Sequence, residues 1–199
     1  RSLGAYANIF AIESFMDELA AKAGKDPYEF RLRHLHDPPA IAVLKKLREL
    51  VGQSNAGIAF SRYKNGGTYC AVAANVSVKA NKVTVHKLWA VVDAGEVINL
   101  DGIRNQIEGG LVQSASWTLF EEVKFDPEQI TSTAWASYPI LHINQAPEVE
   151  VIALDHPDEQ PMGAGEAAQG PAAAAILNAI HNACGKRIRR LPVSTAILI

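Results

Sequence analysis

The sequence predicts an α+β fold, with helices packed on a mixed, largely antiparallel sheet. Three observations predict it: helical spacing of apolar residues over the first fifty positions, β-branched and aromatic residues with turn signals over 57–93, and two further helical patterns after them. A chain of 199 residues with 48% hydrophobic content can bury a substantial core. We therefore expect a single domain over 1–199, with a helical segment at 1–52 and an α+β body at 53–199.

Three helices are expected before residue 52. The first, at 8–23, is predicted to bury an apolar stripe and to expose a charged one. The buried stripe would be Ile9, Ile12, Phe15, Met16 and Leu19, and the exposed stripe Glu13, Asp17, Glu18 and Lys22. Asp26 is expected to cap the second helix, which runs to about residue 35. The third helix spans about 40–51 and directs Leu44 and Leu47 inward.

Three strands are expected next, and turn residues separate them. They lie at 57–63, 68–79 and 82–93. Asn65-Gly66-Gly67 and Ala80-Asn81-Lys82 fall between them and favour antiparallel hairpins. The last strand contains the continuously apolar run 88–92, which is typical of a central strand.

The second half of the chain is predicted to mix helices and strands. We expect a helix at 99–120, a hairpin of 121–125 with 130–136, a strand at 148–154, and a helix from Pro171 to the capping Gly185. Gly109 and Gly110 lie inside the first of these helices, at a cost of about 1 kcal/mol each relative to alanine. Paired glycines there indicate close approach of a ligand or another backbone, and tight helix–sheet packing explains them equally well.

Composition excludes several classes of function. The net charge of −2, without a basic run interleaved with aromatic residues, argues against a nucleic-acid partner. No apolar stretch approaches the roughly 18 residues of a membrane span. Cys70 and Cys184 cannot hold an iron–sulfur cluster, which takes about four thiolates. The chain begins at Arg1, so a leader could have been removed, and the cellular location stays open.

The segment from Met162 to Pro171 carries one carboxylate, Glu166, among glycines and alanines at the start of a helix. Helix N-termini bind anions, but this segment matches neither the phosphate loop nor the full dinucleotide fingerprint, and its carboxylate would repel a phosphate. It therefore favours acid–base chemistry, for which a pocket usually raises the pKa of a glutamate. The alternative is a first-turn glutamate that favours the helix dipole. A carboxylate-dependent hydrolase is disfavoured, because no nucleophile or second acid is placed nearby.

Motifs along nearly the whole chain occur in the order found in one family. They are Arg1-Ser2-Leu3-Gly4 with Ile12–Ala20, Val91–Gly95, Asn99–Gly110, Tyr138–Leu141, Gly163–Glu166 with Pro171–Ala174 and Asn178–Ile180, and Arg190-Leu191-Pro192. Together they resemble the C-terminal part of the molybdopterin-binding large subunit of the xanthine oxidase family. The branch that looks most similar contains the isoquinoline 1-oxidoreductase beta subunit and bacterial aldehyde or N-heterocycle dehydrogenases.

The resemblance implies a molybdenum cofactor-binding domain and hydroxylation of an aldehyde or N-heterocycle with water as the oxygen source. It implies that Glu166 is the catalytic base, acting on a hydroxide ligand of molybdenum. Gln106 would hydrogen-bond the pterin, and Arg1 and Leu3 would line the substrate side. The residues expected near the cofactor are Gly109, Gly110, Gly163, Ala164 and Gly165. No side chain of this chain is assigned as a metal ligand.

The resemblance also implies cofactors and partners. The cofactor would be molybdenum–molybdopterin in its cytosine dinucleotide form, and iron–sulfur clusters would occur only in a separate small subunit. Further partners are the remainder of the large subunit and a small-molecule substrate, and a homodimer is left open. A chain of 199 residues is several times shorter than the family's large subunit, so we expect a fragment or separately encoded piece that is inactive alone. The alternative is a non-catalytic assembly or binding module. Bacterial cytoplasm and periplasm both remain open.

Overall fold

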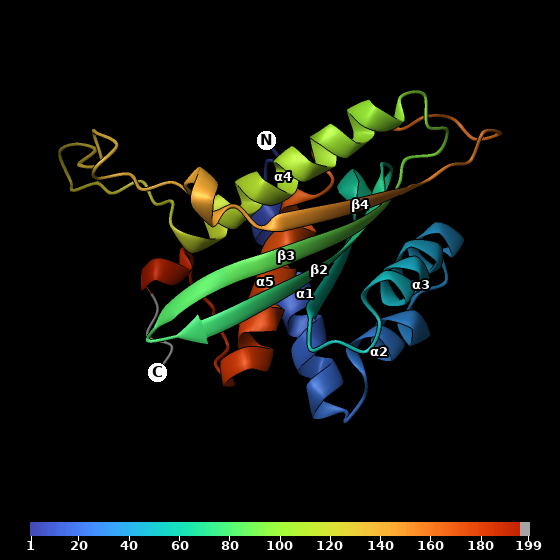
Figure 1. Ribbon diagram of the computed structural model, residues 1–199, viewed down its shortest axis with the longest axis horizontal. Coiled ribbons are helices and arrows are strands. Elements are labelled where there is room, and N and C mark those ends of the chain that lie inside the picture. The colour runs from blue at the N-terminus through green and yellow to red at the C-terminus, as the bar shows by residue number, and fades with distance from the viewer. Residues whose placement is uncertain (196–199) are drawn as a thin grey trace.

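A four-stranded sheet forms the centre of the computed structural model, which describes residues 1–195 (Figure 1). The strand order is β1-β2-β3-β4, with antiparallel pairs β1–β2 and β2–β3 and a parallel pair β3–β4. The strands are β1 (Gly57–Arg62), β2 (Tyr69–Lys79), β3 (Lys82–Asp93) and β4 (Glu148–Leu154). The sheet is thus mixed and largely antiparallel, and the predicted α+β class is confirmed.

Local sequence signals explain most element boundaries. The helices are α1 (Ala5–Lys22), α2 (Pro27–His34), α3 (Pro38–Val51), α4 (Leu100–Leu119) and α5 (Gln169–Cys184). Asp26 caps α2 by accepting hydrogen bonds from two backbone N–H groups, and Asn99 caps α4 in the same way through the N–H of Gly102. Gly185 ends α5 in the left-handed conformation. Ala80 and Asn81 have φ values of 47° and 62°, as a two-residue hairpin turn requires.

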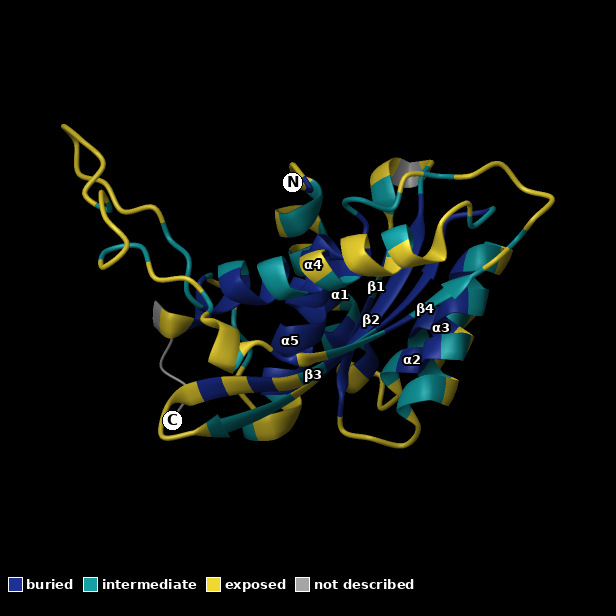
Figure 2. Ribbon diagram, turned by 45° about the horizontal axis from the view of Figure 1, so that its top comes forward, coloured by how far each residue is buried: buried dark blue, intermediate teal, exposed yellow. Residues whose placement is uncertain are grey.

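The two faces of the sheet carry different helices. α4 and α5 pack on one face over a large apolar core, and α3 packs on the other over a smaller one. α5 is buried along most of its length (Figure 2). It approaches β1 so closely that a Cβ on Gly57 would lie 2.0 Å from the backbone nitrogen of Ala179.

Within residues 1–195, no helix combines the length and apolarity needed to cross a membrane.

The predicted orientation of α1 is wrong for four residues, although Ile9, Met16 and Leu19 are half-buried and Lys22 is exposed as expected. Ile12 and Phe15 are 55% and 57% exposed, whereas Glu13 and Asp17 are 5% and 6% exposed. The buried acids have cationic partners from distant segments, and one of them is Arg187, which lies 2.6 Å from Asp17. Helical spacing reveals two stripes but not which one faces the core, because the partners that neutralise the acids lie elsewhere in the chain.

The predicted hairpin at 121–136 is also wrong. Phe125 and Ile130 form one isolated bridge, and no ladder extends from it. The segment 121–142, which we call the arm, projects from one end of the molecule (Figure 1). Several of its apolar residues are exposed, with Phe125 at 76% and Trp135 at 79%, whereas Leu141 at its base packs against the larger core. A two-stranded ribbon without a sheet or helix against it is only marginally stable, so the β-branched residues do not form strands here.

Candidate cofactor and active site

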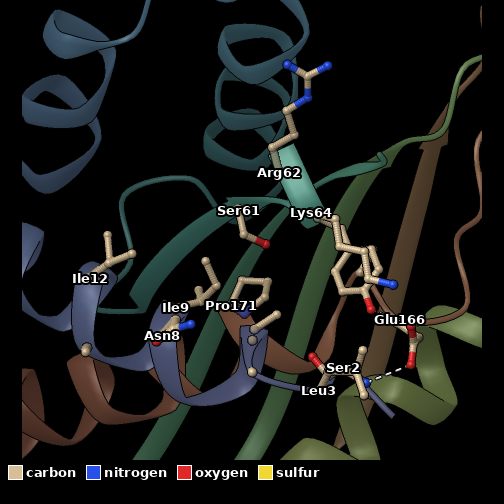
Figure 3. Close-up of a pocket in the computed structure, with 16 residues that line it drawn as sticks. Ser2, Leu3, Asn8, Ile9, Ile12, Ser61, Arg62, Lys64, Glu166 and Pro171 are labelled. Atoms are coloured by element: carbon tan, nitrogen blue, oxygen red, sulfur yellow. Dashed lines mark hydrogen bonds between the residues drawn. The ribbon is translucent and has the colours of Figure 1, made fainter. Parts of the chain in front are cut away.

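Glu166 lies in the loop that leads into α5 and meets two other segments of the chain. Its Oε1 accepts a hydrogen bond of 2.8 Å from the backbone N–H of Ser2 (Figure 3). Its Oε2 accepts a short hydrogen bond from the hydroxyl of Tyr63, in the turn after β1. Each carboxylate oxygen therefore has one protein donor, and the two donors come from distant parts of the sequence.

These donors determine the protonation of Glu166. The hydrogen bond from Tyr63 is the largest cause that holds the pKa of the carboxyl below its usual range, and the bond from Ser2 is the next. Lys64 acts in the same direction. The direction is opposite to the raised pKa usual for a catalytic glutamate. In this geometry Glu166 is an ionised carboxylate and an acceptor.

Arg1 connects the N-terminal segment to α4 and to the Glu166 loop. Its guanidinium donates to Oε1 of Gln106 at 3.1 Å, to Oε1 of Gln113 at 3.3 Å, and to the carbonyl of Gly165. Buried Gln169 completes the connection: its amide nitrogen donates to the Glu166 carbonyl at 2.9 Å, and its oxygen accepts from Nε of Arg1 at 3.1 Å. The structure thus brings together four residues singled out in the sequence, Arg1, Gln106, Gly165 and Glu166.

The other candidate residues occupy different surroundings. Gly109 is exposed on α4, and a Cβ there would meet nothing within 4 Å. Gly110 is buried, and its Cβ would lie 3.1 Å from the side chain of Gln169, so it permits close packing of α4 and α5. Gly163 is exposed, and its carbonyl accepts a hydrogen bond of 2.9 Å from Thr68. Ala164 packs partly against the larger core.

Two hollows flank the Glu166 loop. The first, of about 480 Å³, we call the Glu166 cavity. Its lining includes Glu166, Tyr63 and Lys64, together with the apolar side chains of Leu3, Ile9, Ile12 and Pro171 (Figure 3). The second, of about 320 Å³, we call the Gln106 groove, and it lies between α4 and the loop. Its lining includes Gln106, Ile98, Met162, Ala164 and Gly165. Leu3 is 74% exposed at the edge of the first hollow.

Sequence reasoning missed three contributors to this site. Ser2 acts through its backbone N–H, which leaves no signature in the sequence. Tyr63 stands before an ordinary glycine turn, and nothing local distinguishes it from a core or surface tyrosine. Gln169 gave a weak signal, since a glutamine in a run of small residues at a buried helix start needs partners for both ends of its amide.

The loop of small residues carries one ionised carboxylate and borders two hollows, and concave sites of this kind are where small molecules bind. Among residues 1–195, no cluster of three or more His, Cys, Asp or Glu side chains is arranged to hold a metal ion. The model of the molybdopterin cofactor-binding domain family matches residues 15–147, which is more than half of the chain. The protein belongs to this family.

Curated relatives agree with this membership. The chain is 39% identical over 218 aligned positions to one of the subunits of nicotinate dehydrogenase from Pseudomonas putida, an alignment that covers 98% of the chain and 18% of that protein. It is 29% identical over 208 positions to the beta subunit of isoquinoline 1-oxidoreductase from Brevundimonas diminuta, covering 99% of the chain and 26% of that protein. The chain therefore spans about a fifth to a quarter of the length of these relatives.

Solved structures share the fold. Quinoline 2-oxidoreductase from Pseudomonas putida 86 superposes with a TM-score of 0.59 and 29% identity, over 63% of this chain and 17% of that one. Aldehyde oxidoreductase from Desulfovibrio gigas superposes with a TM-score of 0.56 and 31% identity, over 63% of this chain and 14% of that one. These matches confirm the resemblance to the molybdopterin-binding large subunit of the xanthine oxidase family.

Proposed function

We propose that the chain is the C-terminal cofactor-binding domain of a molybdenum hydroxylase large subunit. The complete protein would hydroxylate an aldehyde or an N-heterocycle and take the oxygen atom from water. One observation carries the proposal: Glu166, held by Tyr63 and Ser2, lines a cavity suited to a small substrate, and the loop that carries it also borders a groove suited to a cofactor.

The residues of the Gln106 groove fit a molybdopterin. Gly102, Ala164 and Gly165 present little or no side chain to the groove, and the amide of Gln106 offers a donor and an acceptor. Gly109 and Gly163 lie outside this lining, and a Cβ on either would meet nothing within 4 Å. We propose that Gln106, Gly109, Gly163, Ala164 and Gly165 contact the bound group. Gly110 would act indirectly, because it faces Gln169 and lets α5 approach. When bound, the group supplies the redox chemistry of its molybdenum.

Glu166 would act as the catalytic base. Its carboxylate is ionised and accepts one hydrogen bond per oxygen, so lone pairs remain on both atoms. It would accept the proton released by the water that supplies the oxygen atom. Arg1 would hold the loop in place, since its guanidinium bonds Gln106 and the Gly165 carbonyl. This contact supports a role for Arg1 on the cofactor side of the loop, rather than the substrate-side role that the resemblance implied.

The Glu166 cavity would receive the substrate. Its walls are mainly apolar, with Leu3, Ile9 and Ile12 among them, which suits a small aromatic ring. The 39% identity to a nicotinate dehydrogenase supports an N-heterocycle over an aldehyde. Leu3, exposed at the cavity edge, would contact this ring.

The remaining parts of the proposal concern assembly. The cofactor would be the cytosine dinucleotide form, and the iron–sulfur clusters would be carried by a separate small subunit. The chain would act with the rest of the large subunit, within a complex of the bacterial cytoplasm or periplasm, and a homodimer of that complex is compatible with the proposal. The chain alone would not turn over substrate, because the other half of the cofactor site would come from the rest of that large subunit.

The deciding experiment is Glu166→Gln in the complete protein, assembled with its partner subunits. We expect turnover to fall by at least about 100-fold, the lower end of what general-base catalysis contributes, while molybdenum and pterin contents stay at wild-type levels. Glu128→Gln, at an exposed position on the arm, is the matched control. Normal turnover of Glu166→Gln would exclude the proposed base.

The second candidate is the non-catalytic assembly module. The lowered pKa of Glu166 favours it, because the carboxylate is a weaker base than an ordinary glutamate. Elemental and pterin analysis of the co-expressed complex separates the two functions. A complex that contains neither molybdenum nor pterin would favour the module.

A further inference from the structure

Two hydrogen bonds connect the turn after β1 to the loop that carries Glu166. Tyr63 donates to Oε2 of Glu166, and Thr68 donates through its Oγ1 to the carbonyl of Gly163 at 2.9 Å. The turn itself is fixed by its backbone: the N–H of Tyr63 donates to the Thr68 carbonyl at 3.0 Å, and the N–H of Gly67 donates to the Tyr63 carbonyl at 2.9 Å. The tyrosine therefore approaches Glu166 from a constrained position.

We infer that Tyr63 is a positioning residue for Glu166, holding one carboxylate oxygen while the Ser2 N–H holds the other, so that the carboxylate meets the Glu166 cavity in one orientation. The inference rests on the proposed function, because a fixed orientation matters for a base that must accept a proton from one defined position. A carboxylate with only one donor could rotate about its terminal bond. The second donor removes that freedom, and both residues line the same cavity.

Tyr63 acts through Glu166 and does not replace it. The hydrogen bond to Glu166 is the largest cause that raises the pKa of the Tyr63 hydroxyl, to about 12. The hydroxyl therefore keeps its proton at neutral pH and serves only as a donor in this pair. The same bond favours the ionised form of Glu166. It therefore keeps the carboxylate able to accept a proton and also holds it in one orientation.

Other charges near Glu166 have smaller effects. Lys64, next to Tyr63 in the turn, lowers the pKa of Glu166, but its effect ranks below the two hydrogen bonds. Desolvation acts in the opposite direction and also ranks below them. Loss of the Tyr63 hydroxyl would therefore remove the largest lowering effect and leave the other charges in place, so the pKa of Glu166 would rise.

The test compares Tyr63→Phe with Tyr138→Phe in the assembled, cofactor-loaded protein. Tyr138 is a matched control, because its hydroxyl donates to Oε2 of Glu121 at 2.8 Å at the base of the arm. For Tyr63→Phe we expect kcat to fall, by about 100-fold at most, because the Glu166 carboxylate would lose its fixed orientation. We also expect the acid limb of the kcat/KM profile to move to higher pH. Tyr138→Phe should leave both unchanged.

A second measurement does not depend on turnover. Carbodiimide couples amines to protonated carboxyls, so peptide mass spectrometry across pH reports the protonation of Glu166 once its labelling is divided by that of exposed Glu128, which corrects for the pH dependence of the reagent and the amine. The labelling midpoint should lie below the ordinary glutamate value of about 4.3 in the wild type and should move upward in Tyr63→Phe. A wild-type midpoint at or above the ordinary value would overturn the inference whether or not Tyr63→Phe assembles.

Failure of this inference can be told apart from failure of the proposed function. If Glu166→Gln retains turnover, the proposed base fails, and the labelling midpoints still show whether Tyr63 holds the carboxylate. If Glu166→Gln is inactive but Tyr63→Phe matches Tyr138→Phe in both the pH profile and the labelling, the base stands and Tyr63 is not its positioning residue.

Discussion

Arg31 and Glu13 form an ion pair of 2.8 Å between α1 and α2, with side chains only 2% and 7% exposed. The guanidinium also donates to the Glu13 carbonyl at 3.0 Å, and the N–H of Phe60 in β1 donates to the Glu13 carboxylate at 2.7 Å. One buried carboxylate thus joins two helices and the edge of the sheet. This arrangement fixes α1, whose first turn adjoins the Ser2 N–H that contacts Glu166.

Removing one partner of this pair should strongly destabilise the chain. We expect Arg31→Met to lower the free energy of unfolding by about 3–5 kcal/mol, because Glu13 would remain buried without its counter-charge. Urea unfolding followed by circular dichroism measures the change. Lys46→Met breaks the exposed Lys46–Glu49 pair and should cost about 1 kcal/mol or less. Equal effects of the two substitutions would contradict the structural role of the buried pair.

Gly109 offers a test of the cofactor contact that is separate from catalysis. Gly109→Ala should stabilise the chain by about 0.5–1 kcal/mol, because the helix gains a better helix former and the new Cβ meets nothing within 4 Å. In the assembled protein the same methyl group would occupy space assigned to the cofactor, so molybdenum and pterin contents should fall. Arg104→Ala, exposed on the same helix, serves as the control. Full cofactor content in Gly109→Ala would remove this residue from the proposed contacts.

The two cysteines should differ in reactivity. Cys70 is completely buried, and burial raises the pKa of its thiol to about 12, so thiolate is scarce at neutral pH. Cys184 is only partly buried at the end of α5. Iodoacetamide at neutral pH should therefore alkylate Cys184 first and reach Cys70 only after unfolding, as peptide mass spectrometry would show. The Cys184→Ala variant should then show no fast-reacting thiol. Similar alkylation rates for the two cysteines in the folded protein would contradict the burial of Cys70.

Local sequence features predicted most secondary structure because they act within a few residues. Asp26 and Asn99 cap helices through backbone N–H groups two or three positions ahead, and Gly185 ends α5 because glycine accepts a positive φ. The strand β3 was predicted with its observed bounds, since its apolar run suits a strand with neighbours on both sides. In each case the physical cause lies in the chain segment itself.

The errors have non-local causes. In α1, Glu13 and Asp17 face inward because Arg31 and Arg187 neutralise them from other segments. In the arm, the apolar residues Phe125 and Trp135 find no core in the described part of the chain, so a β-rich composition does not produce strands. The periodicity of apolar residues shows neither whether a buried charge will find a partner of opposite charge nor whether an apolar side chain will reach a core.

The sequence by itself determined the helices, the strands of the four-stranded sheet and the position of Glu166 in a loop of small residues before α5. These depend on backbone preferences, caps and side-chain size, which are properties of short segments. Only the tertiary structure decided what surrounds that carboxylate. Ser2 and Tyr63 lie 164 and 103 residues away along the chain, and they reach Glu166 because α1, the β1–β2 turn and α5 converge there. The low pKa of Glu166 is set by that convergence.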